Sequence, residues 1–82
     1  MLYLGVGVGG PFDGVEVISR FPKGFLAVDR PINRCWIYDF QENISQFVVR
    51  DADGYDLVND ITAPKNRVRA ALEDEYDVMV AP

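Results

Sequence analysis

Three glycines near the start of the chain, Gly5, Gly7 and Gly10, have the GxGxxG spacing of dinucleotide-binding loops. In such loops a strand precedes the glycines and a helix begins at the last one, so that the helix N-terminus holds the pyrophosphate. Here a turn-forming stretch, Pro11–Gly14, follows Gly10, and Val15–Ser19 then alternates as a strand does. A P-loop is also excluded, because no Gly-Lys-Ser/Thr follows the glycines. We therefore expect no bound cofactor.

Few side chains support any other chemistry. The sequence has no histidine, which is the commonest general base and the commonest transition-metal ligand, and it has a single cysteine, Cys35. Because Cys35 lies in an apolar stretch, we expect a buried thiol rather than a reactive one. The acids of Asp51–Asp56 do not have the spacing of an EF-hand loop. We predict a protein that is not an enzyme, with no catalytic residues and no metal site.

The net charge of −5 is distributed unevenly along the chain. Residues 1–50 hold five acids and five bases, whereas residues 51–82 hold eight acids and three bases. An acidic balance argues against direct binding to nucleic-acid phosphates, which requires basic surfaces. It favours a basic partner, so one hypothesis is an acidic inhibitor that covers the nucleic-acid-binding surface of a host enzyme. The residues that would carry this role are Asp53, Asp56, Glu73, Asp74, Glu75 and Asp77.

Length and composition predict one folded domain over residues 1–82. The hydrophobic fraction of 49% and the charged fraction of 26% are those of an ordinary globular protein. No apolar run approaches the roughly 18 residues that a membrane-spanning helix needs, and the first residues do not have the pattern of a signal peptide. We expect a cytoplasmic protein with no membrane partner.

Short apolar runs separated by turn residues predict strands over most of the chain. The expected strands are 2–8, 15–19, 25–29, 35–40 and 45–50. Asp53 and Gly54 predict a hairpin that returns residues 55–58 beside the fifth strand. Further on, either Asp60 or Thr62 can cap a helix whose first turn contains Pro64. The apolar side of this helix would carry Val68, Ala71, Leu72 and Tyr76. Residues 77–80 are a candidate last strand. The predicted fold class is α+β: an antiparallel β-meander of five to six short strands with one C-terminal helix packed on the sheet.

Glycine at alternate positions leaves one face of the first strand bare, with Leu4, Val6 and Val8 on the other face. A backbone or a large aromatic ring can then lie directly against the glycines. The rings of Trp36, Tyr38 and Phe40, further along the chain, are candidates to cover them. A weaker hypothesis is that the glycine face binds a small ligand.

The stretch Gly9–Gly14, GGPFDG, resembles the GGPxDG opening of small proteins found in phages of actinobacteria and in related prophages. Residues 27–31, 36–39 and 51–57 also resemble stretches of those proteins, so the resemblance spans most of the chain. It implies a phage or mobile-element origin. Because no activity is established for that group, the resemblance implies no catalytic residues.

The strand expected at 35–40 is apolar on both faces, with Trp36, Tyr38 and Phe40 on one face and Cys35 and Ile37 on the other. One short helix cannot cover both faces of such a sheet. The remaining cover would come from a second copy or another protein, unless sheet twist and loops bury these residues within the monomer. We therefore predict a protein-interaction or assembly module, a candidate homo-oligomer that is either a virion accessory or a modulator of a host protein. Its expected contact residues are Arg34, Trp36, Tyr38, Phe40 and Phe47.

Overall fold

The protein folds mainly into β-strands that belong to one sheet. The structure, a computed structural model, describes residues 1–57, 70–71 and 73–82. Its strands and two short 3₁₀ helices are β1 (Tyr3–Val8), η1 (Gly10–Phe12), β2 (Glu16–Ser19), β3 (Gly24–Asp29), β4 (Arg34–Gln41), η2 (Glu42–Ile44), β5 (Gln46–Val49), β6 (Tyr55–Asp56) and β7 (Asp77–Val80). The five main predicted strands and the strand at 77–80 are all present, and their bounds differ from the predicted ones by one residue or less.

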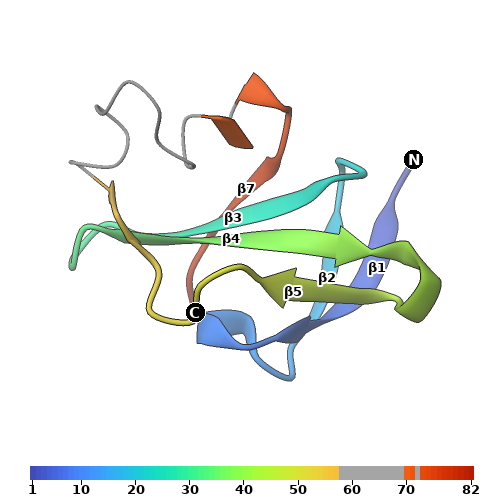
Figure 1. The fold of residues 1–82 in the computed structure, drawn as a ribbon, viewed down its shortest axis with the longest axis horizontal. Coiled ribbons are helices and arrows are strands. Elements are labelled where there is room, and N and C mark those ends of the chain that lie inside the picture. The colour runs from blue at the N-terminus through green and yellow to red at the C-terminus, as the bar shows by residue number, and fades with distance from the viewer. Residues whose placement is uncertain (58–69, 72) are drawn as a thin grey trace.

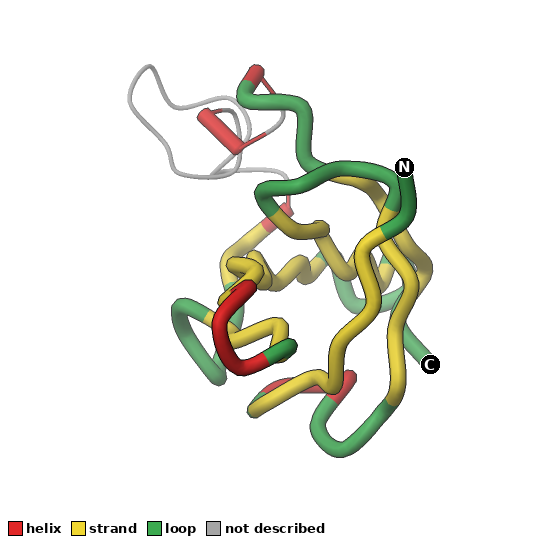
Figure 2. Tube along the Cα trace, turned by 90° about the vertical axis from the view of Figure 1, so that its right-hand side faces the viewer, coloured by secondary structure: helices red, strands yellow, loops and turns green. Residues whose placement is uncertain are grey.

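The sheet is mixed rather than an antiparallel meander, so the predicted α+β fold class is wrong. The strand order is β2-β1-β5-β4-β3-β7, with β6 paired to β4 off this path. β1 runs parallel to β5, and β3 runs parallel to β7, while the other pairs are antiparallel. The strands curl around a central interior to form a nearly closed barrel, with β1 and β2 at one end of the molecule and the β3–β4 turn at the other (Figures 1 and 2).

Two local predictions also need correction. Residues 55 and 56 pair with β4 instead of β5, with Tyr55 opposite Cys35, because β1 and β4 already occupy the two edges of β5. The described residues contain no helix of seven residues or more. The start of the predicted C-terminal helix, at Asp60 or Thr62 and Pro64, lies outside the described residues.

The barrel interior is filled largely by aromatic rings. Phe25 stacks on Tyr38 with ring centroids 4.6 Å apart, and Phe12 meets both rings edge-on. Phe47 packs against Phe25 at 5.2 Å. Since such pairs add to the free energy gained by burying their apolar area, this cluster is the main core of the domain.

A second apolar cluster lies on the outer face of β3 and β4. Leu26, Cys35 and Ile37 point outward there, and Tyr55, Ala71 and Tyr76 cover them. The covering segment ends in a helical turn that Glu75 closes with a φ of 62°, and the Tyr76 N–H donates to the Ala71 carbonyl oxygen at 3.2 Å. Both faces of β4 are therefore apolar, as predicted, but residues of the same chain cover them.

Gly5 and Gly7 point into the barrel, where they allow the chain to pack closely. A Cβ atom on Gly5 would lie 2.8 Å from the Ser45 carbonyl oxygen, and one on Gly7 would overlap the carbonyl oxygen of Phe12. The glycine face is thus packed against backbone and against the ring of Phe47, and it offers no room for a ligand. The GxGxxG spacing serves the fold.

A carboxylate joins the two ends of the strand order. Asp77, at the start of β7, accepts hydrogen bonds from the Arg20 backbone N–H at 3.1 Å and from its Nη2 at 2.9 Å, directly after β2. The Asp77 side chain is only 5% exposed. The hydrogen bond from the Arg20 side chain lowers the pKa of Asp77 below its ordinary value. The backbone N–H groups of Arg20 and Val78 also donate to this carboxylate, and they lower its pKa further.

We expect Gly7→Ala to destabilise the protein by about 1–3 kcal/mol, because the added methyl group has no space beside Phe12. Urea denaturation followed by far-UV circular dichroism measures this change. Gly14→Asn is the control: a Cβ there meets nothing within 4 Å, and asparagine tolerates a φ of 74°. Equal stability of Gly7→Ala and the wild type would contradict the close packing described for β1.

We expect Asp77→Asn to reduce the free energy of unfolding by about 1–3 kcal/mol at neutral pH. Asp74→Asn is the matched control and should have little effect, because the Asp74–Lys23 ion pair is exposed on both sides. Because the folded-state pKa of Asp77 is lowered, its contribution is complete above the unfolded pKa, near 4, and is lost as the pH falls through the folded value. The difference between wild type and Asp77→Asn should therefore shrink on acidification. If the difference in the free energy of unfolding stays constant down to pH 2, the Asp77–Arg20 ion pair is not its cause.

Candidate interaction surface

The outward face of β1 is aliphatic and exposed. Leu4, Val6 and Val8 alternate with the inward glycines, and their exposed fractions are 51%, 42% and 36%. Strand geometry forces this arrangement, because successive side chains point to opposite faces. Since the glycines must occupy the crowded inner face, every larger side chain from Leu4 to Val8 faces outward.

The neighbouring strand β2 extends this exposed surface. Ile18 lies directly opposite Leu4 in the antiparallel register and is 56% exposed. We call Leu4, Val6, Val8 and Ile18 the aliphatic face. The exposed Glu16 lies opposite Val6 on one side, and Gln46 pairs with Val6 on the other, so polar groups border the face. Apolar side chains gathered on two paired strands in this way form a candidate interaction site.

β2 also stands at one end of the strand order. The Gly7 N–H donates to the Val15 carbonyl oxygen, so strand alternation turns the backbone groups of Glu16 and Ile18 away from β1. An edge strand with apolar neighbours is a feature through which chains associate. The aliphatic face therefore adjoins the outer edge of β2, the edge that faces away from β1.

The aromatic residues expected at a contact surface lie mainly inside the barrel. Trp36 is 9% exposed and donates from Nε1 to the Ala52 carbonyl oxygen at 3.1 Å. Tyr38 and Phe47 are fully buried. The Tyr38 hydroxyl donates to the Gly9 carbonyl oxygen at 2.7 Å and accepts from the Phe12 N–H at 2.9 Å, and burial raises its pKa. These three side chains pack within the monomer, so they present no surface to a partner.

The other two expected contact residues are half-buried and engaged within the chain. Phe40 packs against Phe47 and meets the edge of the Tyr3 ring. Arg34 donates from Nε to the Asp53 carbonyl oxygen at 3.0 Å. The alternative in which the sheet and its loops bury the aromatic face within the monomer is therefore the one that the structure shows.

The six acids of the inhibitor hypothesis do not form one equivalent set. Glu73, Asp74 and Glu75 are exposed, as is Asp53 in the turn before β6, whereas Asp56 is half-buried. Asp77 is buried and paired with Arg20, so it is withdrawn from any acidic surface. That hypothesis stays a prediction for the exposed acids.

A polar network on the outer face of β4 ties the C-terminal segment to the sheet. Arg50 binds Asp39 through Nε at 2.6 Å and Nη2 at 3.0 Å, and Nη2 also reaches the Tyr76 hydroxyl at 3.1 Å. The Tyr76 hydroxyl in turn donates to Asp39. Burial and the hydrogen bond to Asp39 raise the pKa of Tyr76 to about 12. This network is satisfied within the chain, which favours a structural role.

The aliphatic face is not among the contact residues that the sequence predicts, although the alternation of Leu4, Val6 and Val8 with glycine carries a signal for it. The signal is steric. A glycine face can pack more closely inward than any other, so the aliphatic side of the strand faces outward.

Comparison with family models, with curated proteins and with solved structures finds no match to this chain. Among the described residues, no cluster of three or more His, Cys, Asp or Glu side chains is arranged to hold a metal ion. No helix in the described part of the chain has the length and apolarity to cross a bilayer.

Proposed function

We propose that this chain is a non-enzymatic interaction module, of the phage-encoded kind that its GGPxDG opening resembles. It associates with a second copy of itself through the aliphatic face, in the cytoplasm of the host cell. The observation that carries the proposal is the outward exposure of Leu4, Val6, Val8 and Ile18 on two paired strands.

The aliphatic face favours a second copy as its occupant because it is apolar in its centre and polar at its border. A two-fold dimer brings the same patch of both chains together, so an apolar centre automatically meets an apolar centre. Glu16 and Gln46 then lie toward the rim, where contact with water is retained. A basic partner would instead require acids among the four side chains of the face, and all four are aliphatic.

The size of the face predicts a weak dimer. Burying the exposed half of one aliphatic side chain contributes about 1 kcal/mol, so the eight side chains of a two-fold dimer contribute roughly 8 kcal/mol. This gain lies within the 4–15 kcal/mol or so that association costs, before any contribution from the rim. At the lower bound of that cost the net gain is about 4 kcal/mol, which corresponds to a dissociation constant of about 1 mM. Contacts at the rim add to this gain, so we expect a weak dimer with a dissociation constant in the high-micromolar to millimolar range.

We expect the wild-type chain to show a concentration-dependent mass in sedimentation equilibrium between micromolar and millimolar concentration. Ile18→Asp should shift the mass to that of the monomer, because it places a charge opposite Leu4. Ile32→Asp is the matched control. Ile32 is 59% exposed, against 56% for Ile18, and lies in the β3–β4 turn at the other end of the molecule (Figure 1).

Circular dichroism establishes that both variants are folded before their masses are compared. Added salt should strengthen the dimer, since it screens the repulsion between two chains of net charge −5. Binding of an acidic surface to a basic partner would instead become weaker as salt is added. A wild-type chain that remains monomeric at millimolar concentration would overturn the proposal. An equal loss of association in Ile32→Asp would overturn the assignment to the aliphatic face.

A further inference from the structure

A separate hollow lies where β3 and β7 end side by side. Its volume is about 360 Å³, within the range of roughly 300–1,000 Å³ that small-ligand sites occupy. The two strands are parallel, with Val28 beside Val80, and the Ala81 N–H donates to the Val28 carbonyl oxygen at 2.9 Å. Paired strands therefore set one side of the hollow, and the turn that follows β3 contributes Arg30 and Pro31.

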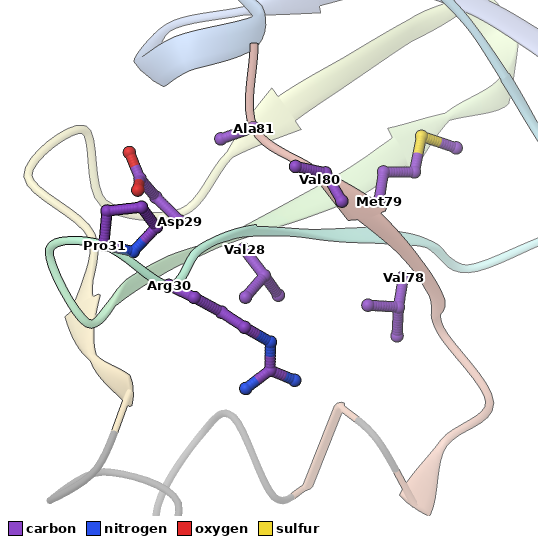
Figure 3. Close-up of a pocket in the computed structure, with 8 residues that line it drawn as sticks. All are labelled: Val28, Asp29, Arg30, Pro31, Val78, Met79, Val80 and Ala81. Atoms are coloured by element: carbon purple, nitrogen blue, oxygen red, sulfur yellow. The ribbon is translucent and has the colours of Figure 1, made fainter.

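The floor of the hollow is aliphatic and open. Val78 and Val80 point outward from β7 and are 53% and 84% exposed, and Val28 lies beside them on β3 (Figure 3). Pro31 adds an apolar wall at the end of β3. An aliphatic ligand lying on these side chains would remove their exposed surface from water.

One charged group accompanies this floor. The Arg30 side chain extends on the same side of the chain as Val28 and Val78, whereas the Asp29 carboxylate lies on the other side (Figure 3). Arg20 and Arg50 pair with carboxylates, and Arg34 bonds to a carbonyl oxygen. Arg30 takes part in no ion pair or side-chain hydrogen bond with the described residues.

We propose that this hollow binds a small aliphatic carboxylic acid. The hydrocarbon chain lies on Val28, Val78 and Val80, and the carboxylate accepts hydrogen bonds from the Arg30 guanidinium. A guanidinium matches a carboxylate in shape and charge, because two N–H groups can donate in parallel to its two oxygens. The site shares no residue with the aliphatic face, so this proposal stands independently of self-association.

The test is a titration with octanoate, followed by NMR of the valine methyl groups. The methyl signals of Val28, Val78 and Val80 should shift and saturate, while those of Val6 and Val8 stay in place. Arg30→Gln should weaken octanoate binding about threefold to tenfold, because it removes the charge and keeps much of the side-chain bulk. Octanoate should bind about fourfold to tenfold more tightly than hexanoate, since the two added methylenes lie on the floor.

Two controls distinguish binding at this site from nonspecific hydrophobic binding. Octylammonium has the same chain with the opposite charge and should not saturate these signals. Val80→Asp should abolish octanoate binding, whereas Ile44→Asp, an exposed aliphatic position of η2 outside the hollow, should leave it unchanged. The proposal is overturned by an absence of shifts at Val78 and Val80, by equal binding to Arg30→Gln, or by equal binding of octylammonium.

Discussion

The close approach of β1 to the chain segments beside it is the constraint on which the rest of this structure depends. Gly7 lies against the Phe12 carbonyl group and Gly5 against that of Ser45, so neither position has space for a side chain. Because the inner face of β1 contributes no bulk, rings from other strands fill the barrel, with Phe47 reaching Gly5 directly. The same alternation leaves Leu4, Val6 and Val8 with only the outer face.

The interior explains why the protein is mainly β-sheet with two separate apolar clusters. β4 alternates between them: Trp36 and Tyr38 point into the barrel, while Cys35 and Ile37 point outward under the C-terminal segment. Tyr38 also holds the η1 turn through hydrogen bonds to Gly9 and Phe12, so the core residue fixes the loop that the glycines begin. Outside these clusters, the side chains of the aliphatic face and the valines of β7 are exposed.

Local pattern was sufficient to find the strands and insufficient to pair them. The turn residues and the alternation of Val15–Ser19 and Cys35–Phe40 predicted strands within a residue of those observed. Pairing β1 with β5, and β3 with β7, brings together segments that are far apart along the chain, and no local feature encodes a parallel partner. The sequence therefore places the side chains of the aromatic strand on two faces, but it leaves open whether the curl of the sheet or a partner covers the face of Trp36 and Tyr38.

The sequence alone determined which residues share a face of each strand, since a strand places alternate side chains on opposite sides whatever its neighbours are. It also determined that Gly5 and Gly7 would accept a close neighbour. Only the tertiary structure decided which side became the interior, because that choice depends on the direction in which the whole sheet curls. The rings of Trp36, Tyr38 and Phe47 were enclosed as a result, and Leu4, Val6, Val8 and Ile18 were left exposed.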